Sequence, residues 1–239
     1  MATTVNKQRL AHQLLSLGKK TAERAREPLP VLEEFIYGLC RENATREQAD
    51  RAYAYLCERF YDWNEVRVSS TRELEDAFAG LTSPEARAQR LVTFLQEVFE
   101  TTFSFNLDDL LKKGLKQAAK QLSRYQAHNE YIGSWVKQRS LGGHAIPLDA
   151  PTLRCSLRLG LIEGGPAGAD HARSALEHLI PKAKGPFFTD LIANVAEEHC
   201  WEEAPRCSGC PLAADCPTAQ AGTVRNGTGS RVAHRAKPR

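Results

Sequence analysis

The sequence predicts an all-α protein, and three observations carry this prediction. Apolar side chains recur at three- and four-residue spacing over most of the chain. Helix-capping signals precede several of these runs, and no segment shows convincing strand alternation. The 239 residues suffice for one domain or two small lobes, and a hydrophobic content of 42% with 26% charged residues is typical of a soluble globular protein.

The first half of the chain contains the signals for five helices. A basic amphipathic helix is expected over residues 7–26, where Pro28 and Pro30 follow it, and a second begins at Val31. The next three begin at capping signals, because a capping side chain or a first-turn proline favours a helix start. These signals are Thr45 with Gln48, Ser70 with Glu73, and Ser83 with Pro84.

Helical periodicity continues through the second half. It extends over residues 107–124, and again from Tyr131 to a glycine stop at Gly142 and Gly143. Asp149 and Pro151 then open a further helix that reaches Leu161. After a loop rich in Gly, Ala and Pro, two more helices are expected at about 171–179 and 186–199.

The net charge of +3 is unevenly distributed along the chain. Residues 218–239 contain five basic residues and no acidic one, which leaves −2 for residues 1–217. The composition of this tail predicts disorder, either as a solvated extension or as a binder of polyanions. A nucleic-acid-binding body would need a local basic patch, which the sequence alone does not reveal.

The chain has no apolar run of membrane length, and its first residues are too charged for a signal peptide. We therefore expect a cytoplasmic protein, in which thiols stay reduced. Three cysteines lie in apolar helical patterns and are expected to be buried core thiols; these are Cys40, Cys57 and Cys155.

Four further cysteines lie within seventeen residues, at the spacing C-x6-C-x2-C-x5-C; they are Cys200, Cys207, Cys210 and Cys216. Thiolates this close together in a reducing compartment indicate a metal or cluster site rather than disulfides. The spacing favours a [4Fe–4S] cluster, which needs four thiolates at the corners of a compact cage. Zinc is the alternative, although zinc ribbons usually pair two C-x2-C knuckles and this stretch has one.

The four-cysteine run resembles the cluster loop of the endonuclease III family, the helix-hairpin-helix DNA glycosylases of base-excision repair. The resemblance extends over about residues 29–217. It implies two helical lobes, a [4Fe–4S] cofactor and double-stranded DNA as the partner of a monomeric protein located with the nucleoid. It also implies a six-helix barrel lobe at 43–148 and a cluster lobe at 149–217 packed with the N-terminal helices of residues 1–42, followed by the disordered tail at 218–239.

Asp149 has two interpretations. An Asp before a helix with a first-turn proline is a common N-cap, and considered alone this interpretation is preferred. The resemblance also places Asp149 at the family's catalytic carboxylate, which follows a short apolar run and precedes the first cluster cysteine by about fifty residues. A carboxylate at that position can stabilise positive charge on the sugar and orient water.

Tyr131 departs from the family pattern. Bifunctional members carry a lysine eighteen residues before the catalytic Asp, and a count back from Asp149 reaches Tyr131. A phenol cannot form the imine that strand cleavage requires, and Lys137 lies almost two helical turns further on. Tyr131 is therefore either a pocket residue of a monofunctional enzyme or an ordinary half-buried aromatic side chain.

Two DNA contacts are implied by the resemblance. The family's hairpin reads roughly L-P-G-x-G, and the matching residues here end in Ala127, His128 and Asn129. In the family this turn brings backbone N–H groups to a DNA phosphate. Asn43 stands where the family has a polar residue that fills the space of an extruded base, but it also has the character of an ordinary turn residue.

We expect a monofunctional DNA glycosylase that hydrolyses the bond between a flipped, damaged or mispaired base and its deoxyribose. Two alternatives remain. One is a non-catalytic DNA-binding or structural descendant of the same fold, which the negative body, the altered hairpin and the missing lysine favour. The other is a zinc-stabilised interaction module.

Overall fold

The structure, a computed structural model, describes residues 7–17, 28–163 and 169–221 and contains only helices and irregular segments in these ranges. The all-α prediction is confirmed. The α-helices are α1 (Lys7–Leu17), α2 (Val31–Arg41), α3 (Arg46–Arg59), α4 (Trp63–Val68), α5 (Thr71–Glu75), α6 (Pro84–Thr102), α7 (Leu115–Leu122), α8 (Glu130–Arg139), α9 (Ala150–Arg158), α10 (Ala169–Leu179) and α11 (Gly185–Glu198). Short 3-10 turns lie between them: η1 (Asp76–Phe78), η2 (Asp108–Lys112), η4 (Lys182–Lys184) and η5 (Cys207–Gly209).

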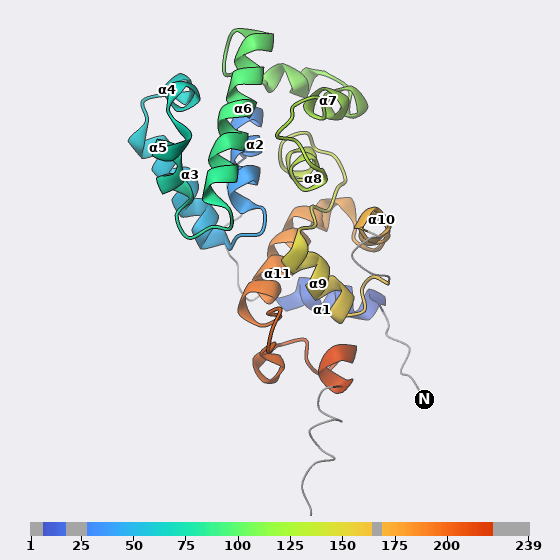
Figure 1. Ribbon diagram of the computed structural model, residues 1–239. Coiled ribbons are helices and arrows are strands. Elements are labelled where there is room, and N and C mark those ends of the chain that lie inside the picture. The colour runs from blue at the N-terminus through green and yellow to red at the C-terminus, as the bar shows by residue number, and fades with distance from the viewer. Residues whose placement is uncertain (1–6, 18–27, 164–168, 222–239) are drawn as a thin grey trace, which may run out of the picture.

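Two hydrophobic cores define two lobes, which lie one above the other in Figure 1. The first core is built by α2 to α8, and its largest fully buried side chains include Phe35, Phe78 and Phe94. The second core joins α1 to α9, α10, α11 and the cysteine loop. Each lobe buries its own apolar helix faces, so each has the anatomy of a small domain.

The domain boundary near the N-terminus differs from the expected one. We expected residues 1–42 to pack with the cluster lobe, and α1 does so against α10 and α11. However, α2 packs against α3, α6 and α8, and its Phe35 ring stacks on Phe94 of α6 at 3.8 Å. The reason is that α2 is buried along nearly its whole length, and the first core offers that surface.

The helix starts largely follow the sequence signals. Thr45 with Gln48 and Ser70 with Glu73 both form reciprocal capping boxes. The Ser83 prediction is wrong in detail, because Ser83 has a left-handed backbone (φ 54°) and makes no side-chain cap, although Pro84 does open α6. The helix expected over 107–124 is instead η2 and α7, with a break at Gly114.

The later helices match with shifted ends. The helix expected to reach Leu161 begins at Ala150 and ends at Arg158. The expected helix at 7–26 is described only as far as Leu17, and most of the basic tail also lies outside the described residues. Cys40 and Cys155 are buried as expected, but Cys57 is exposed, because it lies on the outward face of α3.

Polar side chains cross between the lobes. Arg41 of α2 pairs with Glu197 of α11 at 2.7 Å, and Arg139 of α8 pairs with Asp190 of α11 at 2.5 Å. These contacts connect the C-terminal ends of α2 and α8 to one face of α11. In the described part of the chain, no helix is long and apolar enough to cross a membrane.

Candidate functional site

Asp149 is the N-cap of α9, and its carboxylate is held firmly. Oδ1 accepts from the Thr152 backbone N–H at 3.1 Å and from the Thr152 hydroxyl at 2.6 Å, and the hydroxyl also accepts from the Asp149 N–H at 3.0 Å. This reciprocal box and the Pro151 in the first turn fix the start of α9. The side chain is only 8% exposed, so its orientation is set by the protein rather than by water.

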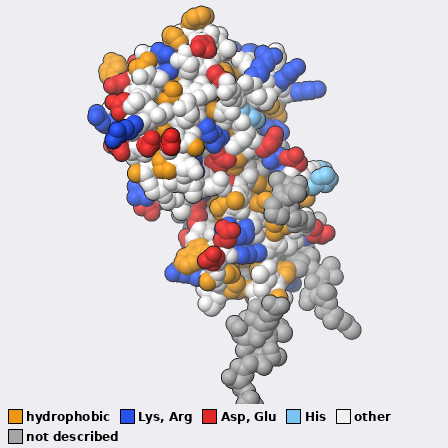
Figure 2. Space-filling view, viewed as in Figure 1, with side chains coloured by type: hydrophobic (Ala, Val, Ile, Leu, Met, Phe, Trp, Pro, Cys, Tyr) orange, Lys and Arg blue, Asp and Glu red, His pale blue; other side chains and the backbone are white. Residues whose placement is uncertain are grey.

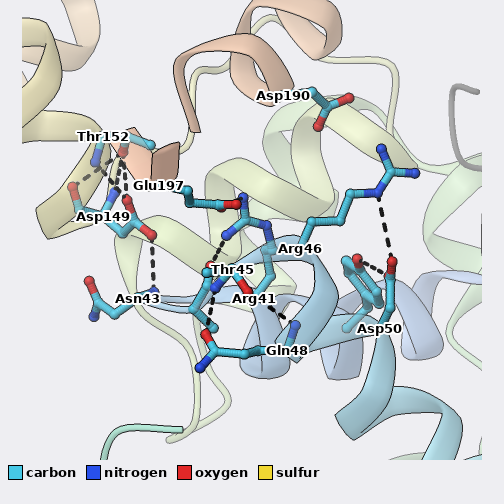
Figure 3. A network of polar contacts seen from close by, with 12 residues as sticks. Arg41, Asn43, Thr45, Arg46, Gln48, Asp50, Asp149, Thr152, Asp190 and Glu197 are labelled. Atoms are coloured by element: carbon cyan, nitrogen blue, oxygen red, sulfur yellow. Dashed lines mark hydrogen bonds and ion pairs between the residues drawn. The ribbon is translucent and has the colours of Figure 1, made fainter. Parts of the chain in front are cut away.

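Asn43 approaches Asp149 from the first lobe, in the loop between α2 and α3 (Figure 3). Its backbone N–H donates to Asp149 Oδ2 at 3.0 Å, and its side-chain oxygen accepts from the Ala150 N–H at 3.1 Å. Asn43 has a left-handed backbone (φ 51°), a conformation that asparagine tolerates better than most residues. Asn43 is therefore a turn residue, as one interpretation expected, and it also contacts the candidate catalytic carboxylate.

Arg41 and Glu197 form a buried ion pair beside this contact (Figure 3). Burial acts to lower the pKa of Arg41, but the nearby Tyr131, Glu197 and Asp149 outweigh it and raise that pKa. Burial raises the pKa of Glu197, against the opposing effect of Arg41. A permanent cation is thus held close to Asp149 in a partly desolvated setting.

A cavity of about 230 Å³ opens between the lobes at this point. Its volume is below the roughly 300–1,000 Å³ of pockets for drug-sized ligands, which suits a group about the size of one heterocycle. Residues of α2, α3, α9, α11 and the loop after Cys200 line it, among them Arg41, Asn43, Gln48, Asp149, Thr152, Glu197, Trp201 and Glu202. Sequence reasoning found Asn43 and Asp149 but missed Arg41, Glu197 and Trp201.

Trp201 lies at one wall of this cavity, directly after the first cysteine of the four. Its Nε1–H donates to the Glu197 carbonyl at 2.6 Å, and the Arg206 guanidinium stacks on its ring at 4.0 Å. The side chain remains 37% exposed. A large aromatic side chain next to a cysteine run is the one sequence signal that would have pointed to it.

Tyr131 lies in the core rather than at the cavity. It is 6% exposed, so the expected half-burial is wrong, and its ring stacks on Trp135 at 6.0 Å. Burial raises the pKa of its hydroxyl well above the ordinary value, although Arg41 opposes this. Tyr131 does not line the cavity of Asp149, and Lys137 lines a different groove, between α7, α8 and α10.

The turn between α7 and α8 contains Ala127, His128 and Asn129, and some of its hydrogen-bond donors are used by carboxylates of the same lobe. The Gln126 N–H donates to Glu97 Oε2 at 2.9 Å, and the Asn129 side chain caps α8 and donates to Glu42 at 2.7 Å. No residue of this turn has a positive φ. Within the described residues the backbone N–H groups of Ala127 and Asn129 make no hydrogen bond, although Ala127 is only 2% exposed.

The four clustered cysteines line one cavity in the second lobe, together with Cys155 of α9. Arg158 of α9 also contacts this loop, through the Cys200 sulfur at 3.7 Å and the Glu202 carbonyl at 2.8 Å. Hydrogen bonding from Cys155 and the nearby arginines lowers the pKa of Cys200 to about 6. Four thiols around one cavity fit the donor set of an iron–sulfur cluster.

A single-ion site is not formed by the described residues as they are placed. No group of three or more His, Cys, Asp or Glu side chains among them converges on one point. The four cysteines therefore share a cavity and a donor chemistry, but the placement of their side chains does not define a metal. Iron and zinc are distinguished by metal analysis.

Known structures share this architecture. A non-covalent endonuclease III–DNA complex matches 92% of this chain and 100% of its own, with a TM-score of 0.72 and 16% identity. A thermostable thymine-DNA glycosylase matches 90% of this chain and 97% of its own (TM-score 0.66, 14% identity), and H. pylori 3-methyladenine DNA glycosylase bound to 1,N6-ethenoadenine matches 80% and 97% (0.60, 12%).

These likenesses establish the fold as that of the endonuclease III-like helix-hairpin-helix DNA glycosylases. No protein-family model matches the chain, and no curated protein matches its sequence. The fold is thus retained at a sequence identity of 12–18% to the structures that it resembles.

Proposed function

We propose that this protein is a base-excision DNA glycosylase that hydrolyses the N-glycosidic bond of a flipped, damaged or mispaired base. The observation that carries the proposal is the position of Asp149. Its carboxylate is anchored by three donors at a cavity between the lobes of a glycosylase fold. The pocket, the anion and the fold together support removal of one extruded base.

The anchoring of Asp149 leaves it able to act. A carboxylate offers about four acceptor positions, and three are used, two on Oδ1 and one on Oδ2. The remaining position on Oδ2 can receive a water proton or face the sugar. As the bond from C1′ to the base nitrogen breaks, its electron pair leaves with the base, and the carboxylate stabilises the positive charge left on the sugar. Water then adds to C1′ and its proton passes to Asp149.

Other cavity residues have supporting roles in this proposal. Asn43 and Thr152 orient the carboxylate, and the Arg41–Glu197 pair offers charged hydrogen-bonding groups to the edge of a base. The exposed part of Trp201 supplies an aromatic surface to a ring in the cavity. We infer that the target is recognised between this Trp and the polar groups of α2 and α3, with Tyr131 as a core residue beneath the site.

We further propose that Cys200, Cys207, Cys210 and Cys216 hold a [4Fe–4S] cluster. The cluster would supply a cross-link and a one-electron redox group to the second lobe. The chain's own contacts then couple this loop to α9, because Arg154 and Arg158 bind the carbonyl groups of Cys200 and Glu202. The duplex is proposed to contact the turn of Ala127, His128 and Asn129.

A non-catalytic DNA-binding descendant is the second candidate. The observation that favours it is that no lysine is among the described residues that line the cavity of Asp149. A glycosylase assay over a panel of lesion and mismatch duplexes separates the two candidates. Strand breaks that appear only after alkali, at abasic sites left by the wild type and not by Asp149→Asn, support the enzyme. No base release from any duplex supports the descendant.

A further inference from the structure

The positive charge of the first lobe is concentrated on and around α7. Residues 110–129 contain five basic side chains and no acidic one, between Asp109 and Glu130. Four of them follow one another at four-residue intervals, and we call these the basic stripe: Lys112, Lys116, Lys120 and Arg124. All four are exposed, and Lys and Arg side chains gather over α7 at the upper right of Figure 2.

Most of this charge is not neutralised by the protein. Lys112 pairs with Asp109 at 2.9 Å, and the neighbouring Lys113 donates to Gln121 at 2.7 Å. Within the described residues, however, the side chains of Lys116, Lys120 and Arg124 make no hydrogen bond or ion pair. Residues 1–217 carry a net charge of −2, so this local excess of positive charge has the opposite sign to the body as a whole.

Helix stability explains only part of the basic stripe. A cation near a helix C-terminus interacts favourably with the helix dipole, and Lys120 and Arg124 lie near that end of α7. Lys112 ends η2 and pairs with Asp109, but Lys116 lies in the first turn of α7, where a cation interacts unfavourably with the dipole. The helix dipole therefore does not account for Lys116, which indicates a role outside the helix.

The adjoining turn offers hydrogen-bond donors but little positive charge. Its Gln126 N–H is taken by the Glu97 carboxylate, and Asn129 is taken by Glu42. Arg90 reaches the turn at the Ala127 carbonyl but is paired with Glu42 at 2.9 Å. A phosphate at this turn would meet two carboxylates, and the nearest unpaired cations belong to the stripe.

We propose that the basic stripe binds the backbone phosphates of a DNA duplex and supplies the charge that the hairpin turn lacks. This inference rests on the proposed function for the identity of the partner. Lys116 and Lys120 are one turn apart, about 6 Å along the helix axis, and their long side chains can reach successive phosphates of one strand. Lys137 is not part of the stripe, because the groove that it lines is also lined by Glu130, Asp170 and Glu177.

The test is the salt dependence of binding to an undamaged duplex, which requires no base release. The variant Lys116→Gln/Lys120→Gln/Arg124→Gln removes three charges that have no internal partner, so the fold stays intact. If each contacts one phosphate, the slope of log K against log salt becomes shallower by about 2.7. Between 50 and 200 mM salt, the wild type then loses about 40-fold more affinity than the variant.

A matched control removes the same charge from the opposite side of the lobe. Arg51, Arg59 and Arg72 are exposed on α3 and α5, which lie across α6 and α2 from α7 in Figure 1. Arg51→Gln/Arg59→Gln/Arg72→Gln should retain the wild-type slope. The conservative Lys116→Arg/Lys120→Arg should also retain it, because a phosphate contact needs only the charge.

Two outcomes would overturn the proposal. One is an equal change of slope in the stripe and control variants, which would indicate an effect of net charge alone. The other is an unchanged slope in the stripe variant with reduced binding to vesicles of phosphatidylserine and phosphatidylcholine, which would assign the surface to a membrane. If the stripe variant shows the shallower salt dependence but the wild type releases no base, the proposed catalysis is wrong. The proposal that the basic stripe binds phosphates would still hold.

Discussion

Asn43 and Asp149 hold one another across the boundary between the two lobes. The Asn43 N–H donates to the Asp149 carboxylate at 3.0 Å, across 106 residues of sequence. The Asn43 side-chain oxygen accepts from the Ala150 N–H at 3.1 Å, across 107 residues. This contact places the carboxylate at the cavity and links the start of α9 to the loop after α2. Its strength and its chemical role can be measured separately.

The first prediction concerns the backbone at Asn43. Replacement by Ala removes the side-chain acceptor and places a Cβ without a local hydrogen-bonding group at φ 51°, a conformation that costs about 1–2 kcal/mol. Replacement by Gly removes the same acceptor without that strain. Urea unfolding should therefore show Asn43→Ala to be less stable than Asn43→Gly by about 1 kcal/mol. Equal stability of the two variants would contradict the conformation described here.

The second prediction concerns the carboxylate itself. Asp149→Asn should abolish base release and retain duplex binding, because the change removes the anion and keeps the shape. Asn keeps the helix cap through Oδ1, but its amide N–H2 replaces the acceptor of the Asn43 N–H, so the free energy of unfolding should fall by about 1–3 kcal/mol. The matched control is Asp62→Asn, because Asp62 caps α4 by accepting from the Glu65 N–H at 2.8 Å and lies in the other lobe. Retained base release in Asp149→Asn would remove Asp149 from the catalytic role.

The third prediction concerns the type of reaction. Strand cleavage by an imine needs an amine at the cavity, and Tyr131 cannot provide one. The product should be an intact strand with an abasic site, cut only after alkali, and borohydride should trap no protein–DNA adduct. Lys137→Ala should behave as the wild type does, because Lys137 lines a different groove. Efficient trapping that disappears in Lys137→Ala would show that this lysine reaches the sugar.

The fourth prediction concerns the cysteine cage. Protein purified without oxygen should be brown and contain about four irons per chain. Cys207→Ser should lose the iron and destabilise the second lobe, because a bound cluster would cross-link the loop from Cys200 to Cys216. Cys57→Ser is the control, since Cys57 is exposed and lies in the first lobe. Stoichiometric zinc without iron in the wild type would establish the zinc alternative.

The fifth prediction concerns the ion pair between the lobes. Glu197→Ala leaves the Arg41 guanidinium without its carboxylate, with an Arg41 side chain only 8% exposed. Leaving a buried charge unpaired should lower the free energy of unfolding by about 3 kcal/mol. Glu202→Ala at the same cavity should cost little, because that side chain is 85% exposed. A similar small effect of both changes would show that water reaches Arg41.

Local sequence signals gave many helix boundaries, because they depend on contacts within a few residues. Thr45 with Gln48 and Ser70 with Glu73 cap their own helices, and Asp149 caps α9, as their spacing indicates. Ser83 is different: its backbone is left-handed (φ 54°), and its side chain makes no capping bond. The break at Gly114 likewise shows that periodicity alone did not fix how long a helix runs.

Site residues that face a distant part of the chain were harder to find. Arg41, Glu197 and Trp201 have no motif of their own, and they become a site only where α2, α11 and the cysteine loop meet. Tyr131 shows the converse, because a count of residues placed it at a pocket and packing against Trp135 placed it in the core. The resemblance supplied Asp149, but its contact with Asn43 needed the structure.

The sequence by itself determined the all-α class, two of the capping boxes, the four-cysteine run and the start of α9, because short-range hydrogen bonds and spacing decide these. Only the tertiary structure decided that α2 belongs to the first core and that Cys57 faces outward. It also decided that Lys116, Lys120 and Arg124 have no partner among the residues that the structure describes. Burial and charge pairing depend on which surfaces meet in space, and many of the surfaces that meet here come from segments tens of residues apart.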